Sequence, residues 1–338
     1  MLFRVLHLGF LFTTLVASLH VAAAPRFWTL AGVRFNDGTV ATGYFSYDDA
    51  TQTIARWNVH VEYFPFSVYF QLFTYLPGNS TMEVSQPSGA AAPELGFSAA
   101  IGVPGEFFGL RHLQIAPLTA LDGSNATVSL DTSLSKEEIP TQGPSRVREI
   151  TAGSLVLTPV PPPVVVVQVD EFYYPALRHY FITADDAEKQ ALDAGVYPGW
   201  ERTGESFNAY AKGSSTGDFI NPVCRYYSPA IIETDVGTVA GFDSHFFSAD
   251  AGECMSVVVR HYDFFWRLEN DNAFQINLPD KTNGACPVGT IPVYRLWNQR
   301  VDSNHRYTTS AAIKEQMLAA GYLAEGYGPD GVVMCALR

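Results

Sequence analysis

A short pattern occurs three times in the second half of this 338-residue chain, and it restricts the possible folds more than any other feature. Each occurrence is a histidine followed by aromatic residues and then by a hydroxyl residue. The three segments are His179-Tyr180-Phe181-Ile182-Thr183, His245-Phe246-Phe247-Ser248 and His305-Arg306-Tyr307-Thr308-Thr309. An aromatic, strand-like run precedes each segment and a helix-like stretch follows it. We therefore interpret this half as three copies of one unit, at about 169–211, 222–277 and 291–337.

The first and third copies also agree in register after the histidine. An offset of 126 residues relates three apolar pairs: Ala187 with Ile313, Ala191 with Met317, and Leu192 with Leu318. This spacing places apolar side chains on one face of a helix. Hydroxyl residues are placed to cap the helix N-termini, namely Thr183, Ser248 and Thr309. Gly195 and Gly321 are placed to end two of the helices in left-handed backbone.

A unit of about 45 residues is too small to bury its own apolar face, so we expect the three copies to share one core. Closure of three copies into a ring leaves fewer exposed strand edges than an open array. The sequence thus predicts a closed pseudo-threefold, β-rich repeat domain over 169–338, with one short helix per repeat. Closure is expected to bring Val332–Ala336 beside Phe172–Tyr174.

The first half, residues 25–157, alternates short strand-like runs with turns and shows almost no helical periodicity. Asp37-Gly38 is a hairpin turn signal, and Arg56–Val61 alternates polar with apolar residues as a half-buried strand does. Asp48-Asp49 is interpreted as another hairpin turn, with calcium binding as a minor alternative. The fold expected here is a β-sandwich. A Pro/Val-rich linker at 158–168, which includes Pro161-Pro162-Pro163, separates it from the repeats.

The N-terminus has the pattern of a secretory signal peptide over residues 1–24. Arg4 supplies the positive charge, Leu8–Leu19 is mostly apolar, and Ala22-Ala23-Ala24 offers small-residue cleavage sites. The apolar run is too short to span a bilayer permanently. The mature protein is therefore expected to be secreted or periplasmic, without membrane insertion.

All four cysteines lie in the repeat half, and an even number in an exported chain predicts two disulfides. Three pairings are open. The nested one, Cys224–Cys335 with Cys254–Cys286, is weakly favoured because it ties the last strand back into the ring. The formal net charge of −13 argues against nucleic acid or an anionic membrane as a partner, since both attract cationic surfaces.

The repeat half resembles a bacterial family known only as domain of unknown function 5648. The resemblance spans about Asp170 to Leu337 and is carried by five segments: His179–Phe181, Gly199–Gly204, Pro222–Tyr226, Asp243–Phe247 and Asn304–Thr309. Such domains are attached to exported hydrolases and peptidases, which implies an accessory role. No catalytic partner domain is recognisable in this chain.

The first half resembles a sandwich-like domain of exported bacterial proteins over about 130 residues. Trp28–Thr39 and Thr42–Asp48 are similar to its opening strands, and Arg148–Val156 is similar to its closing strand. This resemblance implies a fold and no activity.

Five residues are candidates for ligand binding: His179, His245, His305, Trp200 and Trp266. The histidines could converge on a metal, as three imidazoles do in some zinc sites, but ordering of turns by ring hydrogen bonds is the favoured interpretation. The tryptophans either form core or offer flat faces on which sugars stack. No metal or other cofactor is predicted.

Catalytic motifs are absent from the sequence: it contains no H-E-x-x-H, G-x-S-x-G or P-loop pattern. Glu188 and Glu253 recur after their histidines, where they complement a helix dipole. We therefore expect an exported, non-catalytic binding or surface-association protein that recognises a glycan or cell-wall polymer. The alternatives are a hydrolase with an unrecognised site and a structural component of an extracellular matrix.

Overall fold

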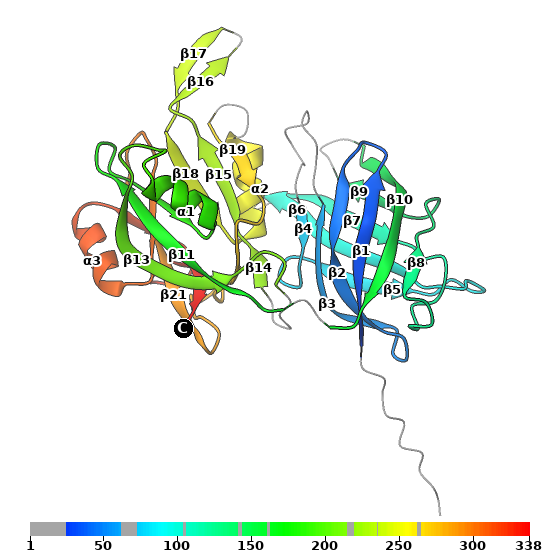
Figure 1. Ribbon diagram of the computed structural model, residues 1–338. Coiled ribbons are helices and arrows are strands. Elements are labelled where there is room, and N and C mark those ends of the chain that lie inside the picture. The colour runs from blue at the N-terminus through cyan, green and yellow to red at the C-terminus, as the bar shows by residue number, and fades with distance from the viewer. Residues whose placement is uncertain are drawn as a thin grey trace, which may run out of the picture.

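The computed structural model describes residues 25–61, 73–103, 106–140, 144–160, 163–214, 220–234, 236–261 and 265–338. The predicted signal peptide lies outside these ranges. The described chain is mainly β with three short helices, which confirms the expected class. Its two halves form separate sheets that lie side by side (Figure 1). No helix within the described ranges is long and apolar enough to cross a membrane.

The N-terminal half is one antiparallel sheet in the order β4-β3-β2-β1-β10-β9-β7-β6-β5, with β8 paired to β10. Its strands are β1 (Arg26–Phe35), β2 (Val40–Asp48), β3 (Thr53–Val61), β4 (Phe73–Tyr75), β5 (Thr81–Ser85), β6 (Glu94–Val103), β7 (Glu106–Ile115), β8 (Thr127–Ser129), β9 (Lys136–Ile139) and β10 (Arg146–Thr158). The sheet curls until β3 contacts β5 and β4 contacts β6. Trp28, Phe45 and Phe97 are buried within the curl. The two facing sheets of the predicted β-sandwich are therefore not confirmed.

Both predicted hairpin turns are present. Gly38 adopts φ +87° between β1 and β2, and Asp37 accepts a hydrogen bond from the amide of Thr39. Asp48 ends β2 and accepts from the amides of Ala50 and Thr51 before β3 begins. The Asp48 carboxylate therefore closes a turn, as Asx residues commonly do.

A buried ionic cluster crosses the N-terminal sheet at β9. Glu137 is fully buried and is bound by Arg111 (2.7 Å) and Arg148, while the hydroxyl of Tyr75 donates to it at 2.8 Å. Burial alone raises the pKa of Glu137, but the two guanidinium groups outweigh it and hold the pKa below its ordinary value. The carboxylate is thus ionised within the core.

The second half contains the same local topology three times. Each copy is a hairpin, a helix and a third strand that pairs with the first strand of the hairpin. The copies comprise β11 (Val166–Tyr174), β12 (His179–Thr183), α1 (Asp186–Asp193) and β13 (Glu201–Tyr210); β15 (Cys224–Ser228), β18 (Ser244–Ser248), α2 (Ala251–His261) and β19 (Arg267–Asn270); and β21 (Thr290–Trp297), β22 (His305–Thr308), α3 (Ala311–Ala319) and β23 (Leu323–Glu325). The repeated histidines occupy one register position, paired with Tyr174, Tyr227 and Trp297.

The copies do not contribute equally to the sheets. The first and third copies lie in one nine-stranded sheet, in which β20 (Gln275–Asn277) and β24 (Val332–Leu337) join them. This sheet also contains β14 (Ile220–Pro222). The second copy forms a three-stranded sheet of its own. The last strand pairs with β13, where Leu337 lies opposite Asn208. The expectation that it lies beside Phe172–Tyr174 is wrong, because β13 stands between β11 and that position.

One hydrophobic core joins the copies, as expected for units too small to fold alone. Phe172 and Phe181 of the first copy, Phe247 of the second and Tyr307 of the third belong to the same buried cluster. The ring of Phe247 packs against Phe181 (6.1 Å between centroids) and against Tyr307 (5.6 Å). Phe181, Phe247 and Tyr307 lie on the second strand of each hairpin, so these three strands depend on each other for burial.

The helices begin one or two residues later than predicted. Asp185 and Ser310 are the N-caps of α1 and α3, and Asp250 accepts from the amide of Glu253 in α2. Three hydroxyl residues lie two positions before these caps, namely Thr183, Ser248 and Thr308. Each hydroxyl accepts a hydrogen bond from the backbone amide of the cap residue. The prediction that Thr183, Ser248 and Thr309 are the N-caps is therefore wrong, because Asp185, Asp250 and Ser310 hold those positions. Gly195 and Gly321 do end their helices with φ +71° and +90°, which confirms that prediction.

The predicted helical stripe is only partly correct. Lys189 and Leu192 are the buried residues of α1, and Lys314 and Met317 are those of α3, an offset of 125 and not 126. The first copy has one more residue between its histidine and its cap, which shifts the register. The aliphatic parts of both lysine side chains are buried, while their ammonium groups donate hydrogen bonds. Lys189 donates to the carbonyl oxygen of Gln168 (2.7 Å), and Lys314 donates to the carboxylate of Asp330 (2.9 Å).

The chain has two disulfides, but not in the favoured nested pairing. Cys224 on β15 is bonded to Cys254 on α2, and Cys286 is bonded to Cys335 on β24. The first bond lies within the second copy, and the second holds the last strand to the segment that precedes β21. The last strand is hydrogen-bonded to β13, β20 and β21, and in this position Cys335 meets Cys286 and not Cys224.

One hairpin stands clear of the rest of the repeat half. It comprises β16 (Ile231–Thr234) and β17 (Gly237–Ala240), which pair only with each other among the described strands (Figure 1). It is inserted between β15 and β18 of the second copy.

Candidate functional site

A cleft of about 340 Å³ lies between the first and second copies. The first copy contributes Phe181, Glu188, Leu192, Tyr197 and Trp200, and the second contributes Arg225, Tyr227, Asp243, His245 and Glu269. The cleft therefore has aromatic side chains from both copies and charged groups of both signs. This volume is within the range of small-molecule sites.

The aromatic side of the cleft is built around Trp200. Its indole is half-buried, stacks on Tyr174 (5.5 Å, 29° between planes) and meets the edge of Phe181 (5.9 Å). Gly199 allows this packing, since a Cβ there would lie 2.2 Å from the Tyr174 ring. Tyr197, at 56% exposure, is the most exposed aromatic among the side chains that the structure describes. The cleft is thus lined by one half-buried and one exposed aromatic side chain.

The charged side of the cleft is built around Arg225. Its two terminal nitrogens each donate to Glu188 at 2.8 Å, and its Nε lies 3.0 Å from Glu269. Nε2 of His245 lies 3.3 Å from the same Glu269 carboxylate, and the imidazole stacks on Tyr227. Burial raises the pKa of Glu269, but His245 and Arg225 together bring it below its ordinary value. The Glu269 carboxylate is therefore ionised and held in place.

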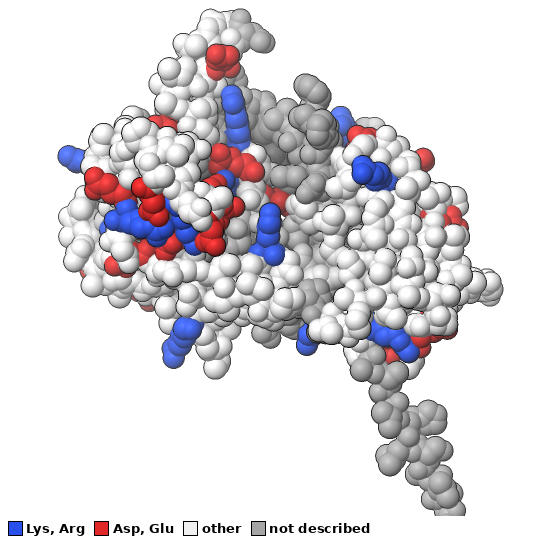
Figure 2. Space-filling view, viewed as in Figure 1, with Lys and Arg blue, Asp and Glu red and all other residues white. Residues whose placement is uncertain are grey.

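Charges of both signs gather on this side of the repeat half. Figure 2 shows lysine, arginine, aspartate and glutamate side chains crowded over the region of α1, while the same face of the N-terminal half is largely uncharged. The ion pairs that hold the copies together therefore reach the surface beside the cleft.

The arginine–glutamate contact recurs between the second and third copies. Arg295 donates from both terminal nitrogens to Glu253 (2.9 and 2.6 Å), and its Nε donates to Glu325 at 3.0 Å. Nε2 of His305 lies 3.2 Å from Glu325. Glu188, Arg225, Glu269 and His245 of the first interface thus correspond to Glu253, Arg295, Glu325 and His305 of the second. The His–Glu–Arg–Glu arrangement is therefore a repeated contact between neighbouring copies.

The third copy reaches the first through different residues. Arg306 donates to both oxygens of Glu171 (3.0 and 2.8 Å). Asn304, which is buried, bonds to both backbone groups of Tyr180 and donates to Ser244 Oγ (3.0 Å), so its amide touches both other copies. These contacts tie the segments before the repeated histidines together.

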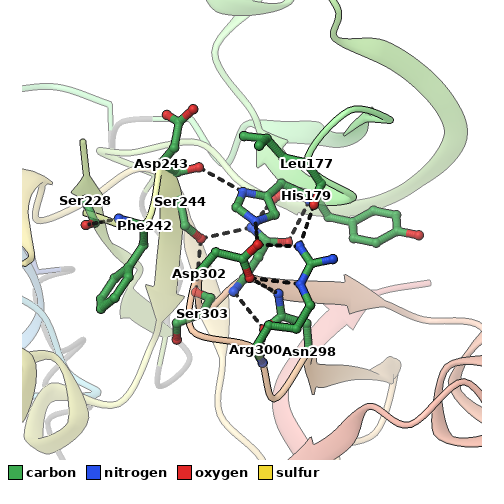
Figure 3. A network of polar contacts seen from close by, with 12 residues as sticks. Leu177, His179, Ser228, Phe242, Asp243, Ser244, Asn298, Arg300, Asp302 and Ser303 are labelled. Carbon is green, nitrogen blue, oxygen red and sulfur yellow. Dashed lines mark hydrogen bonds and ion pairs between the residues drawn. The ribbon is translucent and has the colours of Figure 1, made fainter. Parts of the chain in front are cut away.

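His179 is fully buried in that same region (Figure 3). Its Nδ1 donates to the carbonyl oxygen of Asp243 (2.9 Å), and its Nε2 lies 3.1 Å from Asp302. Arg300 holds Asp302 in turn, with Nε 3.0 Å from the carboxylate. The imidazole thus bridges the loops of the second and third copies and offers no face to a ligand.

The five candidate residues divide into two groups. Trp200 and His245 line the cleft, and the structure brings them together. His179, His305 and Trp266 are buried, and Trp266 packs between Phe242 and Phe246. Across the described residues, no group of three or more His, Cys, Asp or Glu side chains could hold a metal ion. Each histidine instead has its own carboxylate partner.

Sequence reasoning missed four residues that shape the cleft: Tyr197, Arg225, Tyr227 and Glu269. Arg225 and Arg295 occupy the same position in their strands, and Glu188 and Glu253 occupy the same position in their helices. The recurrence of an opposite-charge pair was the available signal. Tyr197 has no counterpart in the other copies and no sequence pattern identifies it.

A family model described as Domain of unknown function (DUF5648) matches residues 237–331. The match runs from β17 to the residue before β24, so it supports the resemblance of the repeat half across parts of its second and third copies. The resemblance of the N-terminal half is not confirmed by a family match. No curated protein and no solved structure matches the chain.

Proposed function

We propose that the chain is an exported, non-catalytic carbohydrate-binding protein whose ligand lies in the cleft between the first two copies. The observation that carries the proposal is that two aromatic side chains, Trp200 and Tyr197, line one cleft together with the charged groups of Glu188, Arg225 and Glu269. A sugar ring has an apolar face that stacks on an aromatic side chain and hydroxyl groups at its rim that need donors and acceptors. The cleft supplies both.

The charged groups suit recognition better than catalysis. An Arg–carboxylate fork fixes the positions of its oxygens and nitrogens, and the remaining lone pairs stay available to ligand hydroxyls. Because the pKa of Glu269 lies below its ordinary value, that group accepts hydrogen bonds and is unsuited to the role of a proton donor. The proposal therefore assigns Glu269 to the recognition of ligand hydroxyl groups.

We further infer that the three copies close into a pseudo-threefold ring. Support comes from ion pairs that join first to second copy (Arg225–Glu188), second to third (Arg295–Glu253) and third to first (Arg306–Glu171). In such a ring the cleft lies between neighbouring copies, where its shape depends on both.

A glycan array and an insoluble-polysaccharide pull-down test the proposed function. Wild-type protein is expected to be retained by at least one cell-wall or plant polysaccharide, and Trp200→Ala is expected to lose that retention. Leu323→Ala is the control, because Leu323 is an apolar side chain of the repeat half that is 47% exposed and lies outside the cleft. Retention of neither protein, or equal retention of wild type and Trp200→Ala, contradicts the proposal.

A hydrolase is the second candidate, because three carboxylates (Glu188, Asp243 and Glu269) and the imidazole of His245 line the cleft. The same purified protein, offered glycoside and peptide substrates, is expected to release no product. Cleavage that disappears in Glu188→Gln or His245→Ala would replace the binding proposal by this one.

A further inference from the structure

The cleft between the first and second copies holds more negative than positive charge. Its lining contains three carboxylates and one guanidinium, those of Glu188, Asp243, Glu269 and Arg225. The excess remains negative even when the imidazole of His245 is protonated, because three negative charges then face two positive ones. Two charged side chains close to the lining, Asp185 and Arg267, have opposite signs and cancel in this count. A cleft with this charge favours a cationic ligand.

The repeated contact between copies explains the other charged groups of the cleft but not Asp243. Asp243 and Ser303 occupy the same position in their copies, two residues before the repeated histidine, and both adopt left-handed backbone (φ +48° and +38°). Each accepts a hydrogen bond from an aromatic side chain of the neighbouring strand. Tyr227 OH donates to Asp243 (3.0 Å), and Trp297 Nε1 donates to Ser303 (3.2 Å). A hydroxyl group is therefore sufficient in this turn, and the architecture of the repeat does not require the charge of Asp243.

One oxygen of the Asp243 carboxylate is open to a ligand. The residue is partly exposed, and Figure 3 shows its carboxylate turned away from His179, which donates to its backbone carbonyl oxygen. Oδ1 accepts from Tyr227, whereas Oδ2 accepts from no residue that the structure describes and is not among the buried unpaired polar atoms. Burial, together with the charge of Asp243, raises the pKa of Tyr227 to about 12, so the phenol keeps its proton and continues to donate.

A series of direct ring contacts leads from Trp200 to Asp243 along the cleft. Phe181 lies 5.9 Å from Trp200 between ring centroids, His245 lies 4.6 Å from Phe181, and Tyr227 stacks on His245 at 4.7 Å. All of these side chains line the cleft. A ligand cation at Asp243 therefore lies close to aromatic rings, which attract cations in addition to the ionic contact.

We propose that the ligand of the cleft is an amino sugar with a free, protonated amine, whose ammonium group binds Asp243 while a sugar ring stacks on Trp200. The identity of the ligand as a carbohydrate rests on the proposed function, while its positive charge rests on Asp243 and on the charge of the cleft. An ammonium group supplies three donors, one of which matches the open oxygen of Asp243. An acetylated amine lacks this charge, so the protein prefers a de-N-acetylated glycan to its acetylated form.

Calorimetric titration of the full-length mature protein compares the dimer of β1,4-linked glucosamine with the dimer of N-acetylglucosamine. The buffer is mildly acidic and of low ionic strength, so that the free amines are protonated. The glucosamine dimer is expected to bind about tenfold more tightly, since a charge-assisted hydrogen bond between ammonium and carboxylate contributes roughly that factor. Added salt is expected to reduce the difference, because it screens the charges. Neither result depends on the folding of a variant.

Asp243→Asn tests the partner of the ammonium group. The substitution removes the charge and keeps an oxygen acceptor for Tyr227, and it is expected to bring the two dimers to nearly equal affinity. Asp330→Asn is the matched control, because it removes the same charge from an exposed side chain (69%) of the repeat half that lies outside the cleft. The control is expected to keep the full preference for the free amine.

The possible outcomes separate this inference from the proposed function. Equal or tighter binding of the acetylated dimer by the wild-type protein overturns the amino-sugar assignment and leaves the cleft proposal standing. A preference for the free amine that survives in Asp243→Asn, or that is lost equally in Asp330→Asn, overturns Asp243 as the partner and attributes the preference to the net charge of the protein. Failure of both dimers to bind overturns the assignment and the cleft as the carbohydrate site.

Discussion

Arg225 of the second copy is held by Glu188 of the first through two hydrogen bonds of 2.8 Å, and the same fork joins Arg295 to Glu253 one copy later. In both cases the arginine lies on the first strand of its copy, and the glutamate lies in the first turn of the preceding helix. The repeated sequence pattern therefore determines the contact between neighbouring copies as well as the fold of each copy. The first of these interfaces is also a wall of the proposed binding cleft.

Removal of one partner from the second fork is expected to destabilise the repeat half. Glu253→Gln leaves Arg295, which is 4% exposed, with only Glu325 as a charged partner. We expect a loss of about 2 kcal/mol in the free energy of unfolding, because a buried cation is left under-paired. Urea denaturation measures it. Glu315→Gln on the exposed side of α3 is the control, and equal effects of the two variants contradict the role of the fork.

Glu137 is expected to be among the most sensitive positions of the N-terminal half. Glu137→Gln leaves the buried Arg111 without a counter-charge and Arg148 with only Asp37, and the loss of a buried ion-pair partner typically costs about 3–5 kcal/mol. Glu138→Gln, on the same strand, is expected to cost less than about 0.5 kcal/mol. Thermal or urea unfolding of the two variants compares them directly. A small effect at Glu137 is incompatible with the buried cluster.

The disulfide pairing has a direct chemical test. A non-reducing peptide map is expected to yield Cys224 linked to Cys254 and Cys286 linked to Cys335. Detection of a Cys224–Cys335 peptide contradicts the structure. Replacement of Cys286 and Cys335 by alanine is expected to cost roughly 4 kcal/mol, on the loop-entropy estimate for a 49-residue separation.

Stability is expected to fall on mild acidification because of His305. Burial lowers the pKa of this imidazole below 6.5, against the opposing effect of Glu325. Below pH 6.5 the unfolded chain takes up a proton that the folded chain resists, so the unfolding free energy decreases from pH 6.5 down to the folded pKa, by at most about 1.4 kcal/mol per pH unit. Unfolding curves between pH 7.5 and 5.5 show this slope, and His305→Gln is expected to flatten it. An identical slope in the variant argues against His305 as its source.

Features encoded in local sequence were predictable. The threefold pattern, the glycines that end α1 and α3, and the turn at Asp37-Gly38 each depend on residues close together in the chain. The equivalence of Leu192 with Met317, at an offset of 125 residues, was not predictable. The first copy has an extra residue before its helix, but the distance along the chain from the histidine to the helix-ending glycine is the same in both copies, so the sequence pattern does not show the shift.

Features that depend on distant partners were not predictable. Strand β9 has the sequence Lys-Glu-Glu-Ile, which looks exposed until Arg111 and Arg148 are brought to Glu137. The disulfide pairing likewise depends on the path of the last strand. In the cleft, Trp200 and His245 were identified because equivalent residues recur in other copies. Tyr197 has no equivalent in another copy, and only its exposure in the same cleft as Trp200 identifies it as a candidate.

The most direct test of the central claim is the response of the five tryptophans to a bound sugar. Indole N–H resonances of ¹⁵N-tryptophan-labelled protein are recorded during titration with the dimer of N-acetylglucosamine. The account predicts a saturable shift of the Trp200 signal, assigned by its absence in Trp200→Phe, while Trp28, Trp57, Trp266 and Trp297 stay unmoved. A silent Trp200, with or without a shift at another tryptophan, contradicts the assignment of the cleft as the carbohydrate site.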